Sequence, residues 1–180
     1  MTSEYQKVET EFVPLFTDLA SAFLGLDLDI RFQLKSNAII LALEVKGEER
    51  REPDQLSESQ RFFVEIALRM ALAHFMGGDS GGVSMLIDTP EGSLDSAYES
   101  RAGQMFADFV GRGNSIIMTA NLNTSELLKR LATVCSGESV QLNSMIDWTD
   151  LSEVQTGAQN LFDNAYQAIA TALTGTDISS

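Results

Sequence analysis

The chain has 180 residues, of which 44% are hydrophobic, and a formal net charge of -14 at pH 7. This length and composition predict one globular domain with a hydrophobic core and exclude a disordered chain. No apolar run reaches the roughly 18 residues that a membrane span needs, so a span is excluded as well. Cys135 and His74 are the only residues of their types, which excludes an internal disulfide and a Cys/His zinc site, so a bound metal would need oxygen ligands, as magnesium does.

Two kinds of periodicity mark the first part of the chain. Apolar residues recur at intervals of three and four from Val8 to Leu24, which predicts an amphipathic helix that ends at Gly25. The runs Leu26–Leu34 and Ala38–Val45 alternate or are rich in β-branched residues, and they predict an antiparallel hairpin. The polar start, MTSEYQKVET, is unlike a signal peptide, so we expect a cytoplasmic protein.

The middle of the chain predicts a parallel sheet with a helical connection. Helical spacing runs from Ser57 to Met76, before a pair of glycines. A strand at Val83–Ile87, a helix from about Ser96 to Val110 and a strand at Ser115–Thr119 follow, and this order predicts a parallel βαβ unit. Parallel strands are normally covered on both faces, so we expect Val83–Ile87 to be buried on both.

Helices are also predicted for the last third of the chain, from about Thr124 to Leu131 and from about Leu151 to Leu173, followed by a polar tail. His74 and Cys135 lie in or beside apolar stretches, so we expect them to pack there. Aromatic residues at helical spacing are expected to form the core. These residues are Phe62, Phe63, Phe75, Phe106 and Phe109.

Two polar positions indicate chemistry. Asp88 directly follows a predicted parallel strand, and sites in open α/β sheets form at the carboxyl ends of strands, so this carboxylate is a candidate magnesium ligand. Ser57 begins the long helix and can form a capping box with Gln60, but a helix start with free N–H groups is also a ready phosphate site. Turn and cap roles are the alternatives, because Glu91 lies in ordinary turn composition and Asp95 can cap the next helix.

The order of these features resembles the C-terminal lobe of an ABC-type ATPase head, of the SMC-like kind found in chromosome-maintenance and DNA-repair ATPases. That family has, in this order, an LSGGQ-type signature motif, a Walker B strand ending in Asp-Glu, a D-loop ending in Leu-Asp, and a switch strand. The counterparts here are LSESQ (Leu56–Gln60), SMLID (Ser84–Asp88), SLD (Ser93–Asp95) and IIMTAN (Ile116–Asn121).

The resemblance implies an α/β fold class: the C-terminal half of an ABC ATPase head, with a mixed sheet, a parallel βαβ core, flanking helices and an N-terminal hairpin. It also implies three parts. Residues 1–25 resemble the helix that leaves a coiled coil, 26–175 correspond to the lobe, and 176–180 form a tail.

The resemblance further implies roles for individual residues. The signature residues would contact, in trans, the nucleotide of a second head, and the D-loop and switch residues would lie nearby. They are Ser57, Glu58, Ser59 and Gln60 for the signature, Ser93 and Asp95 for the D-loop, and Thr119 and Asn121 for the switch. Asp88 would hold Mg²⁺. Thr89 stands where the family has its catalytic glutamate, so we expect Glu91 to act as the base instead.

Three departures from the family pattern bear on function. Glu58 and Ser59 replace the signature glycines, and no histidine ends the switch strand. The sequence also contains no G-x-x-x-x-G-K-[ST] loop, the phosphate cradle of such ATPases. In these heads the P-loop lobe lies across the coiled coil, so the chain looks like half a head. We therefore expect ATP and Mg²⁺ to bind only together with the missing P-loop lobe.

Two functions are compatible with these observations. The first is an ATPase component, inactive without its P-loop lobe, that dimerises with a second head in DNA repair, chromosome maintenance or defence. The second is a non-catalytic, acidic protein-interaction or assembly module that retains the fold. The net charge repels phosphate backbones, so we expect DNA to bind the full assembly rather than this chain alone, and we expect no membrane partner.

Overall fold

The elements follow the predicted chain order. The computed structural model describes residues 6–25, 28–35, 38–45, 47–50, 55–77, 81–121, 126–135, 139–148 and 150–174. Its helices are α2 (Val13–Leu24), α3 (Glu58–Gly77), α4 (Glu99–Val110), α5 (Glu126–Val134), α6 (Glu153–Gly157) and α7 (Gln159–Thr174). Its strands are β1 (Leu28–Lys35), β2 (Ala38–Val45), β3 (Glu48–Arg50), β4 (Ser84–Asp88) and β5 (Ser115–Thr119). The predicted tail at 176–180, and the predicted starts of the hairpin at 26 and of a helix at 124, lie outside the described residues.

The first predicted helix is present but changes character along its length. A π-helical turn, η1 (Val8–Phe12), precedes α2, and Pro14 lies at the start of α2. Proline has no N–H to donate to the preceding turn, which accounts for the change of hydrogen-bond spacing there. As predicted, the helix ends at Gly25, which adopts a left-handed conformation (φ 64°) and donates its N–H to the carbonyl of Ser21 at 2.8 Å.

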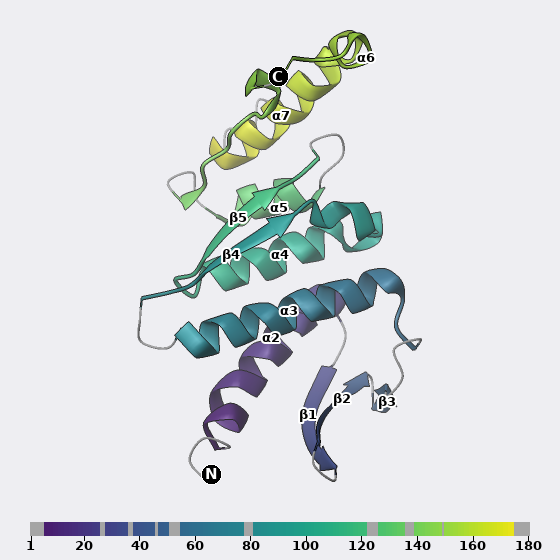
Figure 1. Ribbon diagram of the computed structural model, residues 1–180, viewed down its shortest axis with the longest axis vertical. Helices are drawn as coiled ribbons and strands as arrows, with labels where there is room; N and C mark the ends of the chain where they lie inside the picture. The colour runs from purple at the N-terminus through teal and green to yellow at the C-terminus, as the bar shows by residue number, and fades with distance from the viewer. Residues whose placement is uncertain are drawn as a thin grey trace.

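The described strands form two separate sheets (Figure 1). β1 and β2 pair as the predicted antiparallel hairpin, with Leu28 opposite Val45 and Lys35 opposite Ala38. The short strand β3 extends this sheet, and the sequence analysis missed it because its residues are charged. β4 and β5 pair in parallel and are joined by α4, which confirms the predicted βαβ unit and the α/β class.

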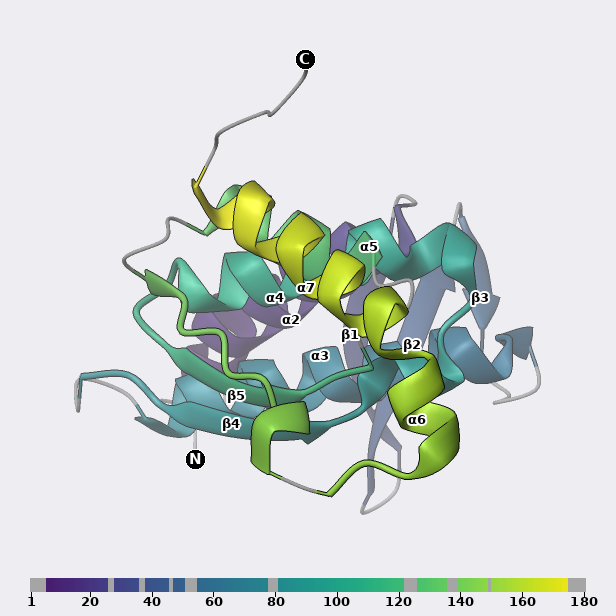
Figure 2. The same cartoon turned by 90° about the horizontal axis from the view of Figure 1, so that it is seen from above.

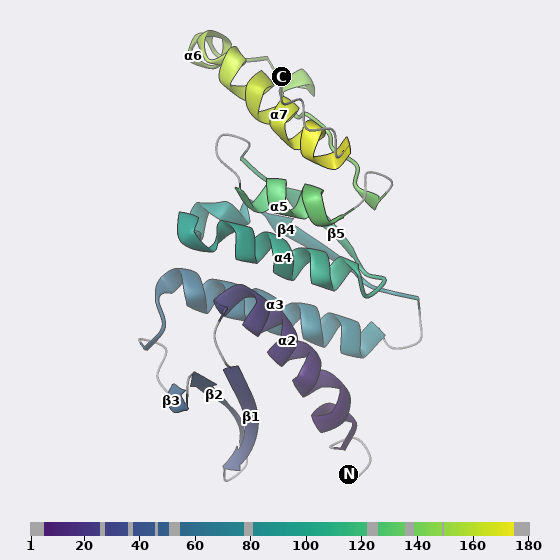
Figure 3. The ribbon, with the colours of Figure 1, turned by 180° about the vertical axis from the view of Figure 1, so that it is seen from behind.

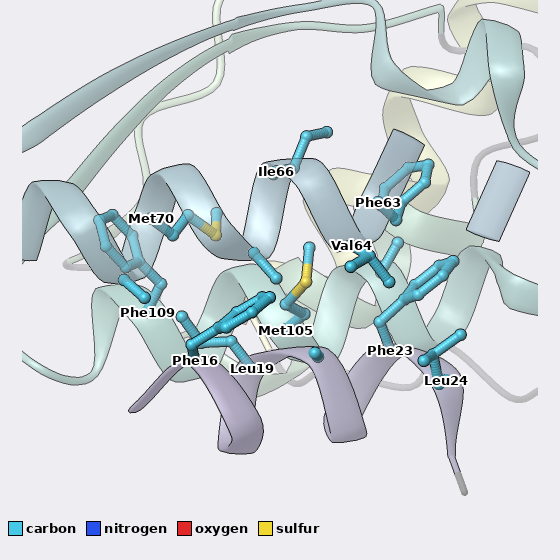
Figure 4. Packing of buried hydrophobic residues seen from close by; sticks show 14 of the residues in the cluster. Phe16, Leu19, Phe23, Leu24, Phe63, Val64, Ile66, Met70, Met105 and Phe109 are labelled. Carbon is cyan, nitrogen blue, oxygen red and sulfur yellow. The ribbon is translucent and has the colours of Figure 1, made fainter. Parts of the chain in front are cut away.

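The core lies where α2, α3 and α4 meet (Figure 4). Of the predicted aromatic core residues, Phe63, Phe106 and Phe109 are fully buried, whereas Phe62 and Phe75 are half-buried and pack against the cluster. The rings of Phe23 and Phe63 stack with centroids 4.7 Å apart. Apolar burial of this kind is the main stabilising term in folding, and here it fixes α3 against the βαβ unit.

A buried polar contact fixes the far end of α3. Asn114 is only 5% exposed, and its side-chain oxygen accepts the Val83 N–H at 3.2 Å while its nitrogen donates to the Phe109 carbonyl at 3.0 Å. Nδ1 of His74 lies 3.0 Å from this nitrogen and 3.2 Å from the side-chain oxygen, and the tautomer of His74 decides which of the two it bonds. His74 is therefore a hydrogen-bonding residue as well as the packing residue expected from the sequence. These contacts join the C-terminal end of α3 to the starts of β4 and β5.

β4 and β5 are not buried on both faces, so that prediction was wrong. Met85, Ile87, Ile116 and Met118 pack into the core, but the alternate residues Leu86 and Ile117 are 77% and 64% exposed. Figures 1 and 3 show why: α4 and α5 lie on one face of the strand pair, and no described helix covers the other.

The C-terminal helix is divided. The segment predicted as one helix from Leu151 to Leu173 forms α6 and α7, separated at Ala158 directly after Gly157, a poor helix former. These helices lie beyond α5, against which α7 packs (Figures 1 and 2). Only Ile169 of α7 is fully buried. None of the described helices is both long enough and apolar enough to span a membrane.

Candidate functional site

The candidate Walker B and switch residues meet at the ends of two paired strands. Asp88 ends β4, Thr119 ends β5, and the two are direct partners in the parallel register. The Thr119 hydroxyl donates a hydrogen bond to Oδ1 of Asp88. The backbone N–H of Thr89 is in turn shared between the carbonyl oxygen and the hydroxyl oxygen of Thr119, at 3.0 and 3.1 Å. The predicted metal residue and one predicted switch residue therefore form a single polar cluster.

The oxygens in this cluster are suited to magnesium. Asp88 is exposed, so its carboxylate is accessible to a cation. Within the described residues no group of three or more His, Cys, Asp or Glu side chains could hold a metal by itself. Mg²⁺ does not need such a cage, because it is commonly held by one or two carboxylates together with waters and phosphate oxygens. The oxygen atoms present here therefore fit a magnesium ion.

Thr89, at the position of the family's glutamate, has a strained backbone. Its φ of 40° lies in the left-handed region, which is unfavourable for a β-branched residue. Such strain persists only where surrounding contacts enforce it and is concentrated at functional sites. Here the bonds from the Thr89 N–H to Thr119 enforce the turn, which directs the chain sharply away from the strand end.

The expected base follows in the next turn. Pro90–Ser93 form a short 3₁₀ turn, η4, whose Gly92 N–H donates to the Thr89 carbonyl at 3.2 Å. Glu91 and Ser93 are both in this turn, but their side chains lie outside the part of the structure that is described. The catalytic role of Glu91 and the D-loop role of Ser93 therefore stay predictions. Asn121 is exposed and lies two residues beyond β5.

The signature counterpart begins α3 with a capping box. Ser57 Oγ accepts the Gln60 N–H at 3.2 Å, and Gln60 Oε1 accepts the Ser57 N–H at 3.0 Å, as predicted from the sequence. Ser57 and Glu58 are exposed, whereas Ser59 is half-buried. A second capping box, Ser152 with Gln155, starts α6 with nearly the same distances, 3.3 and 2.9 Å. A capping box alone is thus not evidence for a signature motif in this chain.

The signature counterpart differs from that second capping box in contacting the D-loop. Ser59 Oγ accepts the Asp95 N–H at 3.4 Å, and Gln60 Nε2 donates to the Tyr98 hydroxyl at 2.9 Å. Asp95 caps the 3₁₀ turn η5 (Ser96–Tyr98) through the Ala97 N–H, as its sequence position suggested. Sequence reasoning missed Tyr98, because its partner lies 38 residues away and no local pattern links them.

All four motif counterparts lie toward one side of the molecule, the right-hand side in Figure 1. β4 and β5 both run toward the end where α3 begins, as the arrowheads in Figure 1 show. The contacts of Ser59 and Gln60 hold this end together, while Asn114 and His74 join the opposite ends of the same elements. The single free thiol plays no part here: Cys135 follows α5, and burial raises the pKa of its thiol, so it stays protonated at neutral pH.

The comparisons agree with this arrangement at the level of fold. A scan against protein-family models and a search of curated proteins find no match. Among solved structures, the chain is similar over 91% of its length, with 13% identity and a TM-score of 0.58, to 97% of a chain from the work "Structural biochemistry of ATP-driven dimerization and DNA stimulated activation of SMC ATPases".

Two further structures are SMC heads. The first is the SMC head domain from Thermotoga maritima, with 17% identity, a TM-score of 0.45, and coverage of 62% of this chain and 38% of that one. The second is the SmcHead bound to the C-winged helix domain of ScpA, with 16% identity, a TM-score of 0.44, and coverage of 67% and 36%. The chain thus spans little more than a third of each of these heads. It has the fold of an SMC-like ABC ATPase head fragment.

Proposed function

We propose that the chain is the C-terminal half of an SMC-like ABC ATPase head and supplies the signature motif and Walker B strand for ATP-dependent head dimerisation and hydrolysis. One observation carries the proposal. The cluster of Asp88 and Thr119 lies on the same face of the parallel strand pair as the uncovered residues Leu86 and Ile117. A lobe that covers this apolar face would also reach the carboxylate at its end.

The uncovered face is more apolar than expected for a solvent-exposed surface, which favours burial against a missing lobe. Side chains alternate along a strand, so Leu86 and Asp88 project to one face, as do their register partners Ile117 and Thr119. Parallel sheets in α/β proteins are covered on both faces, and large apolar side chains left 77% and 64% exposed side by side indicate an interaction surface. We assign this surface to the P-loop lobe, which we call the P-loop partner. We expect it to be encoded in the same reading frame or operon as this chain.

We assign each candidate residue a role in the assembled head. Asp88 would hold Mg²⁺, which would neutralise charge on the phosphates of ATP, and the Thr119 hydroxyl orients the Asp88 carboxylate. Glu91 accepts a proton from the attacking water, a task that Thr89 cannot perform at neutral pH. Residues Ser57 to Gln60 approach the phosphates of a second head, with Ser93, Asp95 and Asn121 nearby. Of the first N–H groups of α3, that of Gln60 is bonded to Ser57 Oγ, whereas those of Glu58 and Ser59 have no acceptor within the helix and suit an anion.

A non-catalytic assembly module is the second candidate. It is favoured by Thr89, which replaces the family's glutamate, and by Glu58, an exposed carboxylate at a helix start that would repel phosphate. In that case the acidic surface, with a net charge of -14, serves protein partners. If the chain is instead an ATPase component, we assign DNA binding to the full assembly. We then expect that assembly to act in DNA repair, chromosome maintenance or defence.

Ser57 provides a test with a matched control. In the head assembled with the P-loop partner, Ser57→Arg is expected to spare ATP binding but to weaken ATP-driven dimerisation at least about tenfold, because a bulky side chain blocks the approach of the second head's phosphates. Light scattering with and without ATP measures this. Ser152→Arg changes the same residue in the other capping box and is expected to dimerise like the parent. Normal dimerisation of Ser57→Arg would remove this helix start from the interface.

A further inference from the structure

The signature counterpart and the D-loop counterpart are directly hydrogen-bonded to each other. We propose that Tyr98 is a positioning residue that, together with Ser59, makes these two segments one rigid unit. The Tyr98 hydroxyl accepts from Gln60 Nε2 at 2.9 Å, and Ser59 Oγ accepts the Asp95 N–H at 3.4 Å. Two contacts thus bridge the signature counterpart and the stretch from Asp95 to Tyr98, which continues the D-loop counterpart. The proposal rests on the proposed function in one respect only: the task of the unit is to meet the nucleotide of a second head.

The Tyr98 ring is held by the core, so its hydroxyl has a defined position. The ring lies against Phe23, with centroids 5.2 Å apart, and Phe23 stacks on Phe63 at 4.7 Å. Phe23 and Phe63 are both fully buried. A ring packed on buried neighbours loses little further entropy when its hydroxyl accepts a hydrogen bond, so the contact with Gln60 can fix the geometry of the segment.

Both ends of the Gln60 side-chain amide are hydrogen-bonded. Because Gln60 Nε2 donates to Tyr98, its Oε1 faces the other way and accepts the Ser57 N–H at 3.0 Å. The capping box at Ser152 shows that this geometry does not require a tyrosine, since Gln155 has no such partner within the described part of the chain. The additional contact of Gln60 therefore serves to join segments rather than to complete a cap.

Ser59 supplies the second contact between the two segments. It stands where the family has a glycine, and its hydroxyl accepts the backbone N–H of Asp95. A glycine has no side chain and could not make this bond. Asp95 then caps η5 through the Ala97 N–H at 3.0 Å, and η5 ends at Tyr98. The Tyr98 N–H also donates to the Asp95 carbonyl at 2.8 Å, so the hydrogen bonds form a closed path from Ser59 through Asp95 and Tyr98 back to Gln60. A displacement of either segment would strain the other.

Hydrogen exchange on this chain alone tests the coupling. Tyr98→Phe keeps the ring packing and removes only the hydroxyl. We expect amide exchange to rise about threefold to tenfold both in residues 57–61 and in residues 95–98, the scale set by the loss of one hydrogen bond. Gln60→Leu should give the same pattern, and the double variant should add little to either. Tyr166→Phe, the same change in α7, should leave both segments as in the parent. A rise confined to residues 95–98 would overturn the proposal.

A second measurement uses the assembled head. A substitution with a merely structural effect would not change the dissociation constant of the ATP-bound dimer. With the P-loop partner present, Tyr98→Phe is expected to leave ATP affinity unchanged and to raise the dissociation constant of the ATP-bound dimer about threefold to tenfold. An unchanged dimer constant would overturn the positioning role. If the parent assembly itself forms no ATP-dependent dimer, the proposed function fails, and the exchange experiment alone then decides whether Tyr98 couples the segments.

Discussion

Replacing Ile117 by glutamate is expected to leave this chain folded and to abolish its association with the P-loop partner. Ile117 is 64% exposed, and a substitution at such a surface position changes stability by only about 0.5 kcal/mol. At an interface the same change loses the burial of a large aliphatic side chain, about 1.5–3 kcal/mol, and also buries an unpaired charge. The dissociation constant should rise about 10²-fold or more, as measured by sedimentation equilibrium or calorimetry.

Leu161 offers a matched control for this experiment. It lies on α7, is 65% exposed, and is also aliphatic, so Leu161→Glu makes the same chemical change at equal exposure but away from the strand face. We expect it to bind the P-loop partner like the parent. Equal binding by Ile117→Glu and Leu161→Glu would show that the uncovered face of β4 and β5 is not the site of association.

Asp88→Asn and Glu91→Gln are expected to affect different steps in the assembled head. Asparagine keeps the shape of Asp88 and an oxygen that can accept from the Thr119 hydroxyl, so the strand end stays intact, but magnesium-dependent nucleotide binding weakens. Glutamine at position 91 cannot accept a proton, so binding persists and turnover falls about 10²-fold or more. Separate assays of nucleotide affinity and of phosphate release distinguish the two effects.

Glu153→Gln is the matched control for the second substitution, because Glu153 is an exposed acid in the first turn of α6, far along the chain from Glu91. It should hydrolyse ATP at the parent rate. If Glu91→Gln also does so while Asp88→Asn does not, Glu91 is only a turn residue. If the parent head binds its P-loop partner but hydrolyses no ATP, the assembly-module function is the correct one.

Local pattern was enough to predict most of the elements. β5 has the predicted bounds, Ser115–Thr119, and α3 begins and ends within one residue of the prediction, because apolar spacing and flanking glycines act over a few residues. The capping box at Ser57 and the cap at Asp95 were predictable for the same reason. β3 was not, since three charged residues become a strand only by pairing with β2.

Contacts between distant residues could not be read from the sequence. Tyr98 meets Gln60 across 38 positions, and His74 meets Asn114 across 40. The exposure of Leu86 and Ile117 was also missed, because alternation along a strand shows which side chains share a face and not whether another element covers that face. These long-range facts define the candidate site, which is why the structure was needed to connect motifs that the sequence only placed in order.

Calorimetric titration with ATP and magnesium tests the central claim most directly, performed first on this chain alone and then on its mixture with the P-loop partner. Because the chain contains no P-loop, which normally supplies most phosphate contacts, we expect no measurable binding by the chain alone and micromolar binding by the mixture. Micromolar, one-to-one ATP binding by the isolated chain would contradict the account, as would a mixture that binds ATP no differently from the P-loop partner by itself.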